Sequence, residues 1–312
     1  MNRIYPITIL RVFCLLQIFL LHYFAGIGLR DTIWIFSIAV PVFLLVSAYL
    51  YGLKHDEDTV LGMGFLIKRF KALAVVYYPF VLSVFIYYAI TEAANIGSFV
   101  KSLAGELLFL PDFVTPLPFC GHLWFMQTLM VCYISLVICS RMKFLKKWFC
   151  SNIISLILLI VVILCGYIYR GIDLVYLFFY LWIYYNAKRI SQLSSKAVVY
   201  FSVAILLVGY LLLSQHYEEA FRMGVYLKYI QTCIMAIITI RLFMIVFVNI
   251  KNISVITWLS AISMEFYLIH HLYVFNYPIY ISLTVTLTLS VVLHFISQRL
   301  QILLFNKNRK TL

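Results

Sequence analysis

The stretch CGHLWFMQTLMVCYISLVICSRMKFLKK, residues 120–147, begins with a histidine and a tryptophan, continues as an apolar run and ends in a basic cluster. An apolar run of about 20 residues is long enough to cross the roughly 30 Å hydrocarbon core of a bilayer as a helix. Lysine and arginine accumulate in cytoplasmic loops, so RMKFLKK at 141–147 indicates the cytoplasmic end of this helix. The stretch therefore predicts a membrane span with its histidine at the outer face.

The composition of the whole chain indicates the same class of protein. Of 312 residues, 65% are hydrophobic and 11% are charged, whereas a soluble domain carries about 25% charged residues. We therefore expect an all-α, polytopic membrane bundle of about ten helices, forming a single domain over residues 1–312. The predicted spans are residues 7–27, 34–54, 72–92, 121–140, 150–169, 172–187, 197–214, 229–249, 254–276 and 278–300.

The basic residues predict the orientation of these spans. On this topology 17 lysines and arginines lie on one side and 5 on the other, with Arg11 and Arg241 inside helices. The positive-inside rule then makes both termini cytoplasmic, in what we expect to be a bacterial cytoplasmic membrane. The net charge of +13 is explained by this surface distribution, so no nucleic-acid partner is expected.

Ionisable side chains at membrane depth are the candidates for function, because each is costly there. His22, His122 and His270 all fall in the outer third of the predicted membrane, on three different helices. Taken singly, a histidine near a helix end is more often an interfacial or packing residue. His271 lies about 100° around the helix from His270 and is taken as structural. The remaining histidines are also taken as structural: His55, His216 and His294.

Three charged residues inside the spans have two interpretations each. Arg241 and Glu265 lie near the midplane of neighbouring predicted helices, where a mutual ion pair is at least as plausible as catalysis. Arg11, in the cytoplasmic half of the first helix, either extends to the headgroups or binds a ligand. The seven cysteines contain no C-x-x-C pair, and we predict neither a metal site nor a permanently bound cofactor.

Segments along the chain, in order, resemble the acyltransferase-3 family of integral-membrane acyltransferases. They are LRVFCLLQIFLLH at 10–22, VPVFLLVSAYLYG at 40–52, FLIKRFKALAVVYYPF at 65–80, GHLWFM at 121–126 and SMEFYLIH at 263–270. In two places the chain departs from the family pattern. Ser47-Ala48 stands where Ser-Gly is usual, and Ala72 stands where many members have a second arginine after Arg69.

The resemblance implies transfer of an acyl group, most often acetyl, from cytoplasmic acyl-CoA to a hydroxyl of a cell-surface or lipid-linked saccharide. The implied partners are thus acyl-CoA as co-substrate, a saccharide and the lipid bilayer. Cations on the cytoplasmic side suit the phosphates of CoA, and we assign donor binding to Arg11, Lys68, Arg69 and Lys71.

The chemistry of the outer zone follows from the poor nucleophilicity of an alcohol. It needs a base or a covalent acyl carrier, and His22 is the predicted catalytic residue in either route. His122, Trp124 and His270 are assigned to the acceptor side or to stabilising the oxyanion. The alternative function is a transporter or flippase of a lipid-linked saccharide, which would use the same intramembrane charges as a path. The sequence leaves the sugar, the acyl chain and the oligomeric state open.

Overall fold

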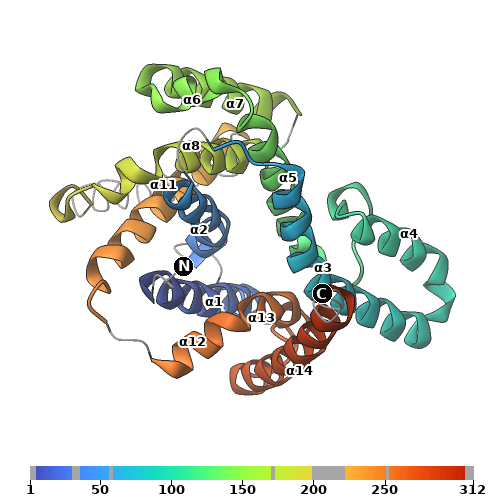
Figure 1. Cartoon of the computed structure of the whole chain (residues 1–312). Coiled ribbons are helices and arrows are strands. Elements are labelled where there is room, and N and C mark those ends of the chain that lie inside the picture. Colours follow the sequence, from blue (N-terminus) through green and yellow to red (C-terminus); the bar gives the residue numbers. More distant parts are fainter. Residues whose placement is uncertain are drawn as a thin grey trace, which may run out of the picture. The chain divides into compact units, whose positions relative to one another are not determined.

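The computed structural model describes residues 5–29, 36–55, 59–169, 173–198, 222–250 and 253–305. Within these ranges the chain forms α-helices and short 3-10 turns and no strand (Figure 1). The α-helices are α1 (Tyr5–Gly26), α2 (Ala39–Lys54), α3 (Met63–Thr91), α4 (Ile96–Leu107), α5 (Trp124–Cys139), α6 (Lys143–Cys150), α7 (Asn152–Tyr169), α8 (Asp173–Ser191), α11 (Arg222–Val246), α12 (Ser254–Ala261), α13 (Ser263–Ile269) and α14 (Ile279–Phe305). The prediction of an all-α fold is confirmed.

Six of these helices, in the part of the chain that is described, are long and apolar enough to cross a membrane, or seven if the bent pair α6–α7 counts as one span. Most of the predicted span 197–214 lies outside the described residues. The predicted span 254–276 is interrupted, because α12 ends at Ala261 and α13 begins at Ser263. The number of ten spans and the cytoplasmic placement of both termini stay predictions.

The chain divides into two compact units, each built from three segments. Unit 1 comprises Met1–Gln17, Ile35–Gly62 and Val131–Thr257, and unit 2 comprises Ile18–Trp34, Met63–Met130 and Trp258–Leu312. The prediction of one domain over the whole chain stays a prediction. Helices α1, α5 and α12 each contribute residues to both units.

In unit 1, α2 packs against α8 and α11 (Figure 1). Gly52 lets α2 approach α8 closely, because a Cβ at this position would lie 2.2 Å from the Tyr184 carbonyl oxygen. The Ser47 hydroxyl shares a 3.1 Å hydrogen bond with the Tyr180 hydroxyl across the same contact. The segment VPVFLLVSAYLYG is therefore a packing surface for α8.

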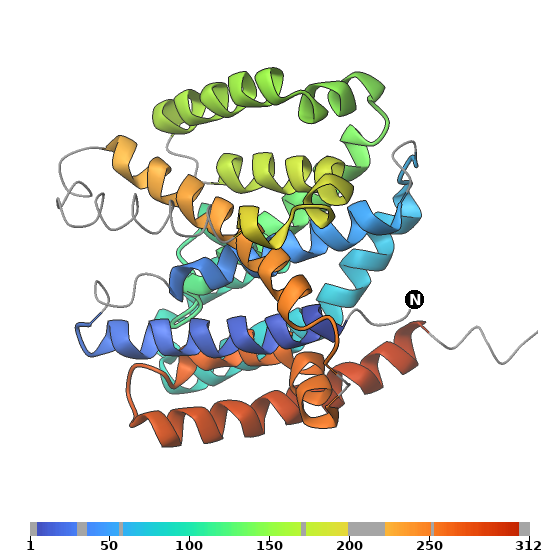
Figure 2. The same cartoon turned by 90° about the vertical axis from the view of Figure 1, so that its left-hand side faces the viewer.

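The chain bends by 97° between α6 and α7 (Figure 2). Side chains satisfy the carbonyl groups that end α6: Ser155 Oγ and Asn186 Nδ2 donate to the Phe149 carbonyl, and Arg189 donates to the Cys150 carbonyl. These bonds replace the helical partners that the carbonyls lose at the bend.

In unit 2, α14 packs against α13 and α3, and α4 packs against α3 (Figure 1). The face of α14 that is buried carries small hydroxyl residues, which let helices approach closely: Ser282, Thr286, Ser290 and Ser297. The segment 93–120, which lies between two of the predicted spans, contains α4. Glu106 on α4 is fully buried and accepts a 2.5 Å hydrogen bond from the Tyr77 hydroxyl of α3.

Candidate active site

Four histidine rings gather in unit 2, at the end of α1 and at two 3-10 turns. The ring centroid of His22 lies 5.1 Å from that of His270 and 4.7 Å from that of His271. His122, in the turn η4 (Gly121–Leu123), lies 5.3 Å from His270 and 4.5 Å from His271. His270 and His271 begin the turn η5 (His270–Leu272). The structure thus brings the three predicted histidines together with a fourth.

Three of the four rings are held by backbone carbonyl groups. His122 Nε2 lies 3.1 Å from the Leu268 oxygen, and His270 Nδ1 lies 2.6 Å from the Tyr267 oxygen. His271 Nδ1 lies 3.0 Å from the Phe119 oxygen. A carbonyl oxygen can only accept, so each of these nitrogens carries the proton and donates it. In the neutral rings the other nitrogen of each ring is then a lone-pair acceptor.

These tautomers change the roles assigned to His122 and His270. The second nitrogens, His122 Nδ1 and His270 Nε2, are buried and have no hydrogen-bond partner among the described residues. Because each neutral ring has already given its single N–H to a carbonyl, neither ring can donate to an oxyanion. Both neutral rings offer a lone pair to a hydrogen-bond donor instead. Their assignment to the saccharide side stays a prediction.

His271 was taken as structural, and the structure places it in the centre of the cluster, in ring contact with His22 and His122. The angle of 100° from His270 assumed a continuous α-helix, but α13 ends at Ile269 and the chain tightens into η5. His22 and His271 are half-buried, whereas His122 is 4% exposed and His270 is 0% exposed. His22 and His271 are therefore the more exposed rings of the cluster.

The backbone that carries the cluster is unusual at Phe119. This residue has φ of 57°, a left-handed conformation that costs a bulky side chain energy and often occurs at functional sites. The Phe119 carbonyl accepts the bond from His271, and the Tyr267 hydroxyl donates to the His122 carbonyl at 2.7 Å. The neighbouring Cys120 is fully buried, and burial followed by the charge of Glu106 raises its thiol pKa, so Cys120 is a poor nucleophile.

Trp124, the third residue assigned to the oxyanion side, begins α5 two positions after His122. Its ring lies edge-on to Phe125, with centroids 6.4 Å apart. The indole N–H of Trp124 is a hydrogen-bond donor by its chemistry, unlike the lone-pair nitrogens of neutral His122 and His270. Its role as an oxyanion donor stays a prediction.

The basic segment forms the beginning of α3 rather than a lead-in to it, since α3 starts at Met63. Lys68 and Lys71 are exposed and Arg69 is half-buried. The Lys71 Nζ lies 4.5 Å from the ring centroid of Phe305, which ends α14. The start of α3 and the end of α14 therefore meet in unit 2. Lys68 and Lys71 remain accessible to an anionic ligand.

Arg11 and His22 lie on one continuous helix, α1. The two are eleven residues apart, which corresponds to roughly 16.5 Å at about 1.5 Å per residue. The structure thus supports the axial separation on which the donor assignment of Arg11 depends. Whether its guanidinium contacts a ligand or the headgroups stays a prediction.

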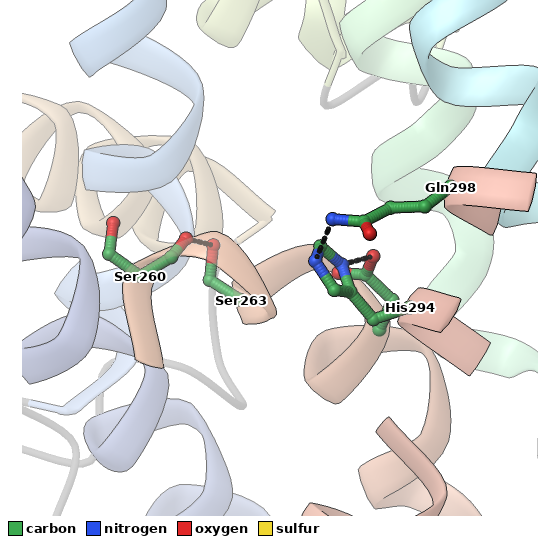
Figure 3. A network of polar contacts seen from close by, with 5 residues as sticks. Ser260, Ser263, His294 and Gln298 are labelled. Carbon is green, nitrogen blue, oxygen red and sulfur yellow. Dashed lines mark hydrogen bonds and ion pairs between the residues drawn. The ribbon is translucent and has the colours of Figure 1, made fainter. Parts of the chain in front are cut away.

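Glu265 and Arg241 each have a hydrogen-bond partner within their own unit. Glu265 Oε1 lies 2.7 Å from His294 Nδ1, and the guanidinium of Arg241 donates to the Leu193 carbonyl at 2.8 and 3.0 Å. Figure 3 shows His294 between the carboxylate and Gln298, whose Nε2 lies 2.8 Å from His294 Nε2. His294, expected to be structural, is thus the partner of Glu265. The sequence did not predict the contact between His294 and Glu265, because the contact depends on how α14 packs against α13.

The other two histidines of the chain are His55 and His216. His55 ends α2, where its ring stacks 6.2 Å from that of Tyr51, and His216 lies outside the described residues. Within the described ranges, no group of three or more His, Cys, Asp or Glu side chains is arranged to hold a metal ion.

Comparison with known proteins shows the family to which this chain belongs. A family model described as "Acyltransferase domain" matches residues 4–304, nearly the whole chain. Curated proteins and solved structures gave no match. The match includes all of the segments on which the resemblance rested, and it gives no support to the transport alternative. The chain belongs to the acyltransferase-3 family, and with its several apolar helices it is a multi-pass membrane acyltransferase.

Proposed function

We propose that this acyltransferase moves an acyl group, most simply acetyl, from cytoplasmic acyl-CoA to a hydroxyl of a cell-surface or lipid-linked saccharide. The observation that carries the proposal is the cluster of His22, His122, His270 and His271, whose contacting ring centroids lie 4.5 to 5.6 Å apart. A saccharide presents several hydroxyl donors. The imidazoles of His122, His270 and His271, when neutral, donate their N–H groups to backbone carbonyls. Their remaining nitrogens can each accept a hydrogen bond from such a hydroxyl.

His22 is the proposed catalytic residue. Its imidazole accepts the proton of the acceptor hydroxyl while the hydroxyl oxygen attacks the thioester carbonyl carbon. The new C–O bond forms, the C–S bond breaks, and the thiolate of CoA leaves with the proton that His22 returns. The transient oxyanion requires a donor, for which we propose the indole N–H of Trp124.

The acyl donor is proposed to bind through its phosphates. Lys68, Arg69 and Lys71 at the start of α3 supply the cations for its phosphates, and Lys68 and Lys71 are exposed as binding requires. On α1, Arg11 lies roughly 16.5 Å from His22 along the helix axis, so it can hold the phosphate end while the thioester reaches the histidines. On this proposal the protein works in a bacterial cytoplasmic membrane and modifies a surface or exported polysaccharide.

The test uses the purified protein in liposomes with acetyl-CoA and a panel of saccharides. Release of the CoA thiol should depend on the saccharide, and the product should gain about 42 Da per acetyl group transferred. His22→Ala should bind acetyl-CoA but release no thiol above background. If His22→Ala turned over at the wild-type rate, the assignment of His22 as the base would be wrong. If the wild-type protein released the CoA thiol at the same rate without a saccharide hydroxyl, the saccharide would be excluded as the acceptor.

A further inference from the structure

A second polar network in unit 2 is not used by the proposed chemistry. It runs from Glu265 on α13 through His294 to Gln298 on α14 (Figure 3). The Glu265 side chain is 4% exposed and that of His294 is 21% exposed, while Gln298 is exposed. The network therefore leads from a buried carboxylate to the surface of a helix that is long and apolar enough to span the membrane.

Two buried oxygens beside this network have no hydrogen-bond partner among the described residues: Glu265 Oε2 and Ser297 Oγ. A buried polar atom without a hydrogen-bond partner destabilises the folded protein, and the hydrocarbon core of a membrane contains no water to replace that partner. A carboxylate oxygen can only accept, so the missing partner of Glu265 must be a donor. A ligand with N–H or O–H groups would meet this requirement.

The network lies at a definite distance from the basic segment. Lys71 Nζ contacts the ring of Phe305, and His294 lies eleven residues before Phe305 on α14. Eleven residues of helix cover roughly 16.5 Å. Ser297 lies three residues closer to Phe305 than His294, a rise of roughly 4.5 Å.

The acyl donor has a segment with matching dimensions and chemistry. Between its pyrophosphate and its sulfur, CoA carries a pantetheine arm of about thirteen bonds, which spans roughly 15 Å if three bonds cover about 3.5 Å as in an extended peptide. The arm has two amide groups whose nitrogens are about four bonds apart, or roughly 5 Å by the same measure. Each amide N–H needs an acceptor once the arm has left water.

We propose that Glu265 and Ser297, with His294 fixing the carboxylate, bind the pantetheine arm of the acyl donor by accepting hydrogen bonds from its amide N–H groups. This inference rests on the proposed function, since it requires acyl-CoA to be the donor. It places the phosphates at Lys68 and Lys71 and the arm along α14, with its sulfur directed away from Phe305.

His294 acts here as a positioning residue. Its Nδ1 binds Glu265 Oε1 and leaves Oε2 for the ligand. The amide of Gln298 can present either its nitrogen or its oxygen to His294 Nε2, so the ring stays in place whether neutral or protonated. An asparagine at position 294 can supply the same donor to Glu265 without an imidazole that carries protons.

The experiment compares two donors, acetyl-CoA and acetylpantetheine, which has the same arm without the adenosine and its phosphates. Glu265→Met should raise KM for both donors by the same factor, about tenfold or more for loss of a charged acceptor, with kcat little changed. Glu265→Gln keeps an acceptor oxygen and should have a smaller effect. Neutralising Lys68 and Lys71 should raise KM for acetyl-CoA alone.

Further variants separate binding from folding and from proton transfer. Glu265→Met with His294→Leu replaces the whole pair by apolar side chains, a change that buried ion pairs often tolerate, and should show the raised KM in folded protein. His294→Asn should keep both KM values within about twofold, because Nδ2 can replace Nδ1 as donor. Thr288→Val is the matched control on α14, since its hydroxyl bonds the Thr284 carbonyl of its own helix.

The outcomes are distinct. A wild-type protein that transfers acetyl from neither donor would overturn the proposed donor and this site with it. A wild-type protein that transfers acetyl, with KM values unchanged in Glu265→Met and in the double variant, would overturn the arm site alone. Loss of kcat in His294→Asn at unchanged KM would show that the network moves protons instead, and would also overturn the proposal.

Discussion

Replacing His271 tests whether the fourth ring of the cluster takes part in acyl transfer. The ring has two separable functions, because Nδ1 donates to the Phe119 carbonyl while Nε2 remains as an acceptor next to His22. In His271→Asn the amide N–H can replace Nδ1–H and the acceptor nitrogen is lost. In His271→Gln the side-chain amide can replace Nε2 with an acceptor oxygen, and the bond to Phe119 is lost.

The sizes of the two effects follow from ordinary hydrogen-bond energies. A neutral hydrogen bond contributes about 0.5–1.5 kcal/mol, so losing one acceptor should lower kcat/KM for the saccharide by about two- to tenfold in His271→Asn. A buried carbonyl left without a donor costs about 1–3 kcal/mol, which should appear as lower stability in His271→Gln. Phe119 already has an unfavourable φ of 57°, so losing the hydrogen bond to its carbonyl should further destabilise the loop that contains it.

The assay measures steady-state transfer to the saccharide together with thermal unfolding in detergent. We expect His271→Asn to unfold near the wild-type temperature with reduced kcat/KM, and His271→Gln to show the reverse pattern. Wild-type kinetics in His271→Asn would refute the participation of His271. A loss in His271→Asn as large as that in His22→Ala would refute the division of roles, because the accessory ring would then be the base.

Three further predictions concern the catalytic base, the donor site and the topology. His22→Ala and His22→Gln should keep acyl-CoA binding, measured by calorimetry, and lose transfer by about 10² or more, as removal of a general base requires; near-normal turnover would move the assignment to His122. Neutralising Lys68, Arg69 and Lys71 together should raise KM for acyl-CoA more than for the acceptor, and equal effects would mean that they act only as cytoplasmic surface charge. A cysteine introduced at Lys146 should resist an impermeant thiol reagent in intact cells, and labelling there would invert the predicted orientation.

The sequence by itself determined the class of protein and much of its helical structure. Apolar runs of about 20 residues can be recognised as membrane helices without tertiary information, because each helix must satisfy its own backbone hydrogen bonds in the bilayer. The helices α1, α2, α5 and α11 accordingly fall close to the predicted spans. The motifs of the family are local as well, and the family match over residues 4–304 confirmed them.

The sequence also placed His22, His122 and His270 at one depth, since depth follows from position along a span. It placed His271 away from the other histidines because helical periodicity assumes an unbroken helix, whereas α13 ends at Ile269 and His271 contacts His22. The ring contact of His271 with His22 and its bond to the Phe119 carbonyl join segments that lie far apart in the sequence. Periodicity contains no information about them.

Only the tertiary structure decided which hydrogen bonds the site residues make. Three rings of the cluster donate to a backbone carbonyl, and position along a predicted span does not show which nitrogen does so. In their neutral forms His122 and His270 then each keep one lone-pair acceptor. Glu265 in the same way binds His294, which comes 29 residues later on α14. Sequence fixes the depth of a polar group in a membrane, but its partner depends on the rotation and packing of helices, which only the folded chain determines.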